Sequence, residues 1–173
     1  MKRKIEAFLS DLIGLPLWSI GRAGDIEWFA FGNERREVTG RDNETKIVSE
    51  YSLHVQCAWR IRNQDKIIVA SRDRFYPPGN DPLSNLGEFE WDTPGGNRLD
   101  ELISKLLEER SVNPFIVISV LADTVGGVNI NLSEDYRLEI FPDDSLPSEY
   151  WRFFKPYSEN EHFIITGHGI ELE

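Results

Sequence analysis

Four polar residues near the middle of the chain, His54, Gln56, Arg60 and Arg72, have side chains suited to binding an anion. A guanidinium presents a planar fork of N–H donors to a carboxylate or phosphate, and imidazole and amide groups add further hydrogen bonds. A competing interpretation is that the arginines form internal ion pairs with acidic residues such as Asp73, Glu50 or those of the second half of the chain. The four residues are therefore a candidate ligand-binding face, either of a binding protein or of an enzyme.

A second group of candidates lies in a long irregular segment, where Glu88, Glu90 and Asp92 alternate around Trp91. If residues 88–92 form a short edge strand, the three carboxylates share one face. Such a face could hold Ca²⁺ or Mg²⁺, but a solvated acidic edge that discourages edge pairing explains it as well, and we predict no metal site. Aromatic side chains on irregular segments often anchor partners, so we expect these four residues to bind a protein partner.

No catalytic residue is predicted. His54 and Cys57 are close in sequence, but residues three apart on a strand face opposite sides. Cys57 lies among Val55, Trp59 and Ile61, where a thiol is desolvated and inert. A single cysteine also excludes an internal disulfide and a multi-cysteine zinc site. The glycine pairs at 126–127 and 167–169 lack the spacing of phosphate-binding loops and indicate turns, so we predict no cofactor.

Charge is unevenly distributed along the chain. The net charge of −11 argues against nucleic acid as a partner, because binding phosphates requires excess cations. Residues 1–87 contain 13 basic and 12 acidic residues, whereas residues 88–173 contain 6 and 18. The acidic second half either keeps the protein soluble by self-repulsion or docks a basic partner. A surface that binds divalent cations is a further alternative.

The elements that position these residues follow from apolar spacing. Residues 5–13 are spaced as one face of an amphipathic helix that ends at Gly14. Residues 26–31 are predicted to form a strand, and the charged residues 33–44 are predicted to form an exposed loop or hairpin tip. Strict alternation over residues 51–62 predicts a single strand with one buried face, paired through a turn at 63–66 with residues 67–72.

The second half contains one further helix and more strands. Residues 73–97 form a long loop, and Asn97 is the predicted N-cap of a helix whose apolar face includes Leu99, Ile103 and Leu106. The apolar run 115–121 predicts a central strand covered on both faces. Further strands are expected near 127–133, 136–141, 149–154 and 162–166. The predicted fold is a single α+β domain over residues 1–173, mainly an antiparallel sheet of six to eight strands with two principal helices.

The chain is expected to be cytoplasmic. No stretch approaches the roughly 18 apolar residues that a membrane span needs. The basic start, Met1–Lys4, is followed by Glu6, Ser10 and Asp11, which interrupt the apolar run that a signal peptide requires.

Four segments resemble those of a group of small bacterial proteins. They are HVQCAWRI (54–61), SRDRFYP (71–77), EYWRFF (149–154) and HFIITGHGIE (162–171). The resemblance runs from about residue 50 to the end of the chain and implies a bacterial origin. No activity is attached to the group, so no catalytic or binding residue is carried over. The leading hypothesis is therefore a non-catalytic binding module that docks a basic protein through its acidic second half.

Overall fold

The computed structural model describes residues 1–33, 36–39, 45–83 and 89–173. Two α-helices, α1 (Lys2–Leu9) and α2 (Arg98–Glu109), and two 3₁₀ segments, η1 (Ser10–Leu12) and η2 (Ser71–Phe75), accompany the strands. The strands are β1 (Pro16–Ala23), β2 (Ile26–Phe31), β3 (Arg36–Thr39), β4 (Thr45–Val48), β5 (Tyr51–Val55), β6 (Ala58–Asn63), β7 (Lys66–Ala70), β8 (Phe115–Ala122), β9 (Val128–Leu132), β10 (Tyr136–Phe141), β11 (Glu149–Phe154), β12 (Phe163–Thr166) and β13 (Gly169–Leu172).

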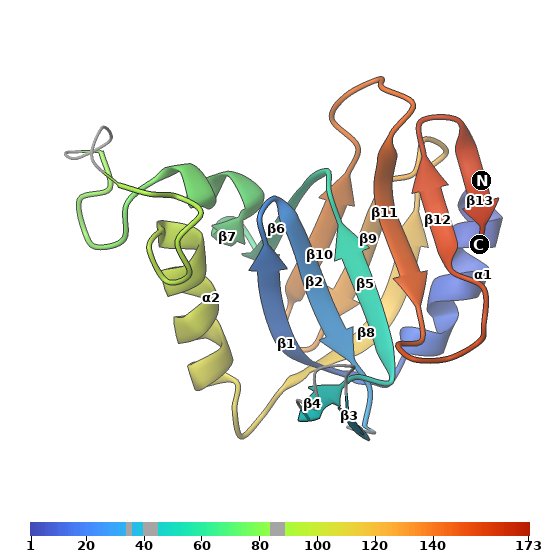
Figure 1. Ribbon diagram of the computed structural model, residues 1–173, viewed down its shortest axis with the longest axis horizontal. Helices are drawn as coiled ribbons and strands as arrows, with labels where there is room; N and C mark the ends of the chain where they lie inside the picture. Colours follow the sequence, from blue (N-terminus) through green and yellow to red (C-terminus); the bar gives the residue numbers. More distant parts are fainter. Residues whose placement is uncertain (34–35, 40–44, 84–88) are drawn as a thin grey trace.

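Eleven strands form one antiparallel sheet in the order β13-β12-β11-β5-β2-β1-β8-β9-β10-β6-β7, and β3 pairs separately with β4. The β1–β8 junction is short, with the pairs Pro16–Ile116 and Leu17–Phe115. There the sheet folds over, so that β8, β9, β10, β6 and β7 form a back layer behind a front layer of the other six strands (Figure 1). The core lies between the layers, where Phe29 of β2 meets Trp59 of β6 edge to face, with ring centroids 5.0 Å apart.

One run of sequence passes from the front layer to the back layer. β5 ends at Val55 and β6 begins at Ala58, and between them the N–H groups of Gln56 and Cys57 both donate to the Tyr150 carbonyl, at 2.8 and 3.2 Å. All the alternate side chains of this run are buried: Tyr51, Leu53, Val55, Cys57, Trp59 and Ile61. The predicted buried face is therefore confirmed. The single strand over 51–62 is wrong, because the chain bends at residues 56–57 while keeping the same side toward the core.

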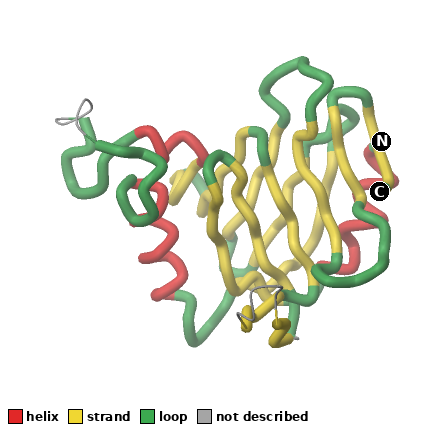
Figure 2. Tube along the Cα trace, in the orientation of Figure 1, coloured by secondary structure: helices red, strands yellow, loops and turns green. Residues whose placement is uncertain are grey.

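The two helices flank the sheet on opposite sides (Figure 2). α1 packs on β8 and buries Ile5 and Leu9, and Phe8 stacks on Phe163 of β12 with centroids 4.2 Å apart. α2 packs against β1, β7 and η2, burying the predicted stripe that contains Leu99, Ile103 and Leu106. Each aliphatic side chain removed from water in this way contributes roughly 1.5–3 kcal/mol. Neither of these helices, nor any other in the described ranges, has the length and apolarity to cross a bilayer.

The predicted antiparallel sheet with two helices is confirmed, with more strands than the six to eight expected. β1 and β13 are among those that were not predicted. The run 115–121 forms β8 as expected, but Ile118 and Leu121 are exposed, because packing covers the inward face of the strand and leaves its outer face open. Residues 89–92 form no strand but an irregular segment and a turn, because Arg22 and Asn97 bind the backbone of Trp91 in place of a neighbouring strand.

Candidate functional site

The four residues of the predicted anion-binding face are not brought together. His54 points away from the core on the front layer, where it meets Phe154 edge to face at 4.8 Å and lines a hollow with Trp18 and Trp28. Burial lowers the pKa of His54, and the nearby charge of Arg152 lowers it further. Arg60 lies on the outer face of the back layer and lines a different hollow. The bend at residues 56–57 causes this separation.

The remaining two residues of that group are also apart. Gln56 is exposed at the bend itself, and Arg72 is exposed on η2. Arg60 instead binds Glu139 of β10, with Nε 2.5 Å from the carboxylate. An ion pair with an acidic residue of the second half is the competing interpretation that the sequence left open, and for Arg60 it holds.

Three residues of the predicted partner-binding group lie together in the structure. Glu90, Trp91 and Asp92 follow one another in an exposed turn near the start of α2, and Glu88 lies outside the described residues. Because residues 89–92 are not a strand, alternation does not place their carboxylates on one face. Asp92 instead accepts from Arg22, with Nη1 and Oδ1 3.2 Å apart.

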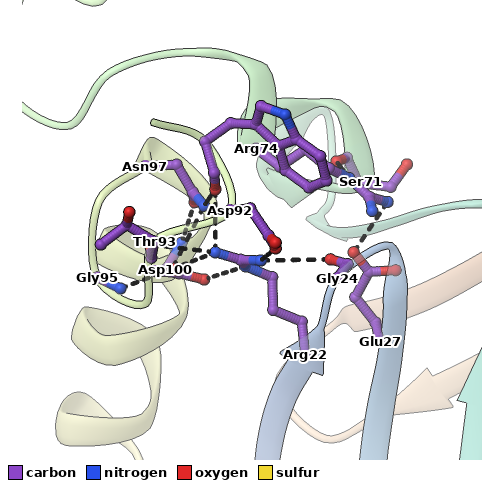
Figure 3. A network of polar contacts seen from close by, with 11 residues as sticks. Arg22, Gly24, Glu27, Ser71, Arg74, Asp92, Thr93, Gly95, Asn97 and Asp100 are labelled. Carbon is purple, nitrogen blue, oxygen red and sulfur yellow. Dashed lines mark hydrogen bonds and ion pairs between the residues drawn. The ribbon is translucent and has the colours of Figure 1, made fainter. Parts of the chain in front are cut away.

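Arg22 holds this turn against the sheet. Its Nε and Nη2 donate to the two carboxylate oxygens of Asp100 at 2.8 and 3.0 Å, the paired geometry in which guanidinium and carboxylate bind most strongly. Nη2 also donates to the carbonyl of Trp91 at 3.0 Å, and Nη1 lies 3.3 Å from that of Gly24 in the β1–β2 turn. One side chain, only 6% exposed, thus joins the end of β1 to the first turn of α2 and to the turn before it (Figure 3).

Asn97 ties the same turn from the helix side. Its Oδ1 accepts from the N–H of Asp100 at 2.9 Å, which confirms the predicted N-cap. Its Nδ2 donates to the Trp91 carbonyl at 2.6 Å, so this carbonyl accepts from two buried side chains. The Gly95 N–H donates to Oδ2 of Asp100 at 2.8 Å and closes the network (Figure 3). The backbone at Trp91 is therefore held by side chains from both β1 and the N-cap of α2.

A buried ion pair lies beside this network. Glu27 of β2 is fully buried, and its Oε1 lies 2.9 Å from Nη2 of Arg74 (Figure 3). Arg74 is held by its own Nε, which donates to the Ser71 carbonyl at 2.9 Å. Neither Glu27 oxygen accepts a well-aligned hydrogen bond from a described residue. Burial therefore raises the pKa of Glu27 to about 7, although the charge of Arg74 and the nearby indole of Trp59 oppose this shift.

Two exposed aromatic rings lie next to the network formed by Arg22, Asn97 and the Glu27–Arg74 ion pair. Phe75 is the last residue of η2, and its ring meets that of Trp91 at 5.8 Å between centroids. The guanidinium carbon of Arg74 lies 5.7 Å from the centre of the Phe75 ring. Trp91 is 36% exposed and Phe75 half exposed, so this aromatic pair presents apolar surface to solvent from a fixed backbone.

Sequence reasoning missed Arg22 and Glu27 as members of the site. The strand 26–31 carries a signal for Glu27, because alternation places it on the same face as Phe29 and Phe31, both of which are buried. A carboxylate on a buried face requires a partner, and that requirement could have identified Glu27. No local pattern marks Arg22, whose partners Asp92 and Asp100 lie 70 and 78 residues away.

Two features bear on the chemistry of this site: the state of Cys57 and the accessibility of the groups near Trp91. Cys57 is buried as predicted, and burial raises the pKa of its thiol to about 12, which removes the thiolate at neutral pH. The groups that converge near Trp91 are occupied with one another, whereas the aromatic pair faces solvent. Comparisons with protein-family models, with curated proteins and with solved structures give no match to this chain.

Proposed function

We propose that this protein is a non-catalytic binding module that docks a basic protein partner through the aromatic pair and the carboxylates around it. The observation that carries the proposal is the fixed backbone of Trp91, bound by Arg22 and Asn97 while the indole stays accessible. A large aromatic side chain held in place before binding loses little entropy when a partner arrives. Binding energy at protein interfaces concentrates on such residues.

The exposed carboxylates near the aromatic pair favour a partner that carries positive charge. The arginines that form ion pairs at this site are withdrawn from solvent, since the side chains of Arg22 and Arg74 are 6% and 8% exposed. The carboxylates are not: Asp92 is 63% exposed, and Glu90 is exposed and forms no ion pair with a described residue. Asp92 and Glu90 thus place two exposed carboxylates beside Trp91, against one exposed arginine, Arg72, on η2. A partner bearing lysine or arginine gains attraction there, and its cations can also lie over the aromatic faces.

The test is a selection of binders from a displayed library of random peptides on the immobilised chain, at low and at high salt. We expect enrichment of lysine and arginine at low salt and loss of the enriched peptides at high salt, because exposed charges are screened. Trp91→Ala should weaken the selected peptides at least about tenfold, the loss expected for a central aromatic anchor.

Phe141→Ala is the matched control, because Phe141 is an aromatic residue of similar exposure on the outer face of the back layer. It should leave the selected peptides unaffected. Circular dichroism of both variants checks that each remains folded. Enrichment of acidic or purely apolar peptides, or equal losses in the two variants, would reject the proposal.

A further inference from the structure

The outer face of the back layer carries a grid of polar residues that the docking surface does not use. Strand register places Asn129, Glu139 and Arg60 side by side across β9, β10 and β6. The neighbouring row runs across β8, β9, β10 and β6, with Ser119, Asn131, Arg137 and Arg62. The residues between these rows, such as Ile130, Leu138 and Ile61, face the core and are buried.

Three arginines in this grid share one carboxylate. Nε of Arg60 and Nε of Arg62 bind Glu139 at 2.5 and 2.7 Å, and Nη1 of Arg137 lies 3.8 Å from it. Burial alone would raise the pKa of Glu139, but the hydrogen bonds from Arg62 and Arg60 outweigh it and lower that pKa, so the carboxylate is ionised. This cluster has two more positive charges than negative ones, within a protein of net charge −11.

The cations face solvent and the carboxylate lies beneath them. The side chains of Arg60, Arg62 and Arg137 are 40%, 25% and 34% exposed, against 12% for Glu139. Each guanidinium donates a hydrogen bond from its Nε to a neighbour on the sheet. Arg60 and Arg62 donate to Glu139, and Arg137 donates to Oδ1 of Asn131 at 2.7 Å. Within the described residues, the Nη2 groups of all three donate no hydrogen bond, so an approaching anion finds donors ready.

The pairing of β10 with β6 places two arginines side by side, and a bound anion would reduce the resulting repulsion. Arg137 and Arg62 lie directly opposite each other on β10 and β6, and like charges in that position destabilise a sheet. Glu139 offsets part of this repulsion. A hollow of about 680 Å³ opens over the same row, lined by Arg62, Arg137, Asn131 and Ser119. Glu134 and Asp135 also line this hollow, and Glu134 is already bound to Arg110 at 2.8 Å.

We infer that this grid binds a small molecule bearing a phosphate monoester, with Arg62 and Arg137 holding the phosphate and Arg60 completing the charge. A phosphate monoester carries up to two negative charges at neutral pH, which equals the surplus of the cluster. A polyanion such as nucleic acid is disfavoured, because it would extend over the acidic remainder of the surface. A small ligand responds mainly to charges within the screening length of about 8 Å.

The test uses inorganic phosphate as the probe, titrated into the full chain at constant ionic strength with chloride as the balancing anion and followed by calorimetry or by amide shifts in NMR. We expect saturable binding with shifts confined to β6, β9 and β10. Arg137→Gln and Arg62→Gln should each weaken binding on the order of tenfold, the loss of one charge-assisted contact.

Two further variants keep the inference falsifiable. Arg72→Gln makes the same charge change on an exposed arginine outside the grid and should leave binding unchanged. Glu139→Gln removes the competing carboxylate and should tighten phosphate binding. No saturable binding, equal effects of Arg72→Gln and Arg137→Gln, or weaker binding by a folded Glu139→Gln protein would each overturn the inference.

Discussion

Ion pairs between arginine and carboxylate occur in two regions of this molecule, and the two regions differ in which partner is covered. Beside α2, Arg22 and Arg74 are buried and are outnumbered by Glu27, Asp92 and Asp100. On the outer face of the back layer, three partly exposed arginines surround one covered carboxylate, Glu139. In the first region the cations bind parts of the chain to one another, and the carboxylate of Asp92 faces solvent. In the second the cations themselves face solvent.

The difference shows that arginine content alone does not predict what a surface binds. What matters is which partner of each pair is covered, because the exposed partner sets the charge that a ligand meets. A buried pair is also costly to break, since the remaining charge loses both water and partner, whereas an exposed pair contributes little. The contrast can therefore be tested by matched substitutions in the two regions.

The largest effect is expected for Arg22→Met. This change leaves Asp100 without its paired donors and removes one of the two donors to the Trp91 carbonyl. Unfolding should therefore become easier by about 3–5 kcal/mol, the usual loss when one partner of a buried pair is removed. Arg62→Met on the partly exposed cluster, where Arg60 and Arg137 remain beside Glu139, should cost within about 1 kcal/mol. Urea unfolding followed by tryptophan fluorescence measures both. Similar losses in the two variants would erase the contrast between the regions.

A pH effect follows from the buried pair. Because the pKa of Glu27 is raised to about 7, the folded protein holds a proton that the unfolded chain releases above its ordinary pKa of 4.5. This group therefore makes the fold less stable as pH rises from about 4.5 to about 7, by up to about 3 kcal/mol, with no further change above that range.

Glu27→Gln removes this contribution, so the difference in unfolding free energy between wild type and variant should change with pH across that window. Glu108→Gln is the control, because Glu108 is exposed on α2. Denaturant unfolding at several pH values gives the comparison. A difference between wild type and Glu27→Gln that stays constant with pH would show that Glu27 is ionised throughout.

A smaller effect than that of Arg22→Met is expected for Asn97→Ala, which changes no charge. It removes the cap of α2 and one of the two donors to the Trp91 carbonyl, at a cost of about 1–2 kcal/mol. Asn97→Asp keeps the capping oxygen and loses only the amide donor, so it should retain more stability. If both variants lose equally in urea unfolding, the cap is not the source of the stabilisation.

Local patterns predicted most of the fold and little of the site. Alternation and apolar stripes depend only on residues that are close together in the sequence. The buried face of 51–61, the cap at Asn97 and the hairpin of β6 with β7 were predicted from such patterns and are confirmed. The bend at residues 56–57 was not predictable, because alternation is identical on a straight strand and on one that changes layers. Contacts of Arg22 with Asp100, and of Arg60 with Glu139, depend on that layer arrangement.

The bend at residues 56–57 also has a consequence for how the molecule opens. Residues 51–61 belong to both layers and bury one continuous face between them, so we expect the two layers to unfold as one cooperative unit. Amide protons of β5 and β6 are therefore expected to exchange with solvent through the same global opening, at matching rates.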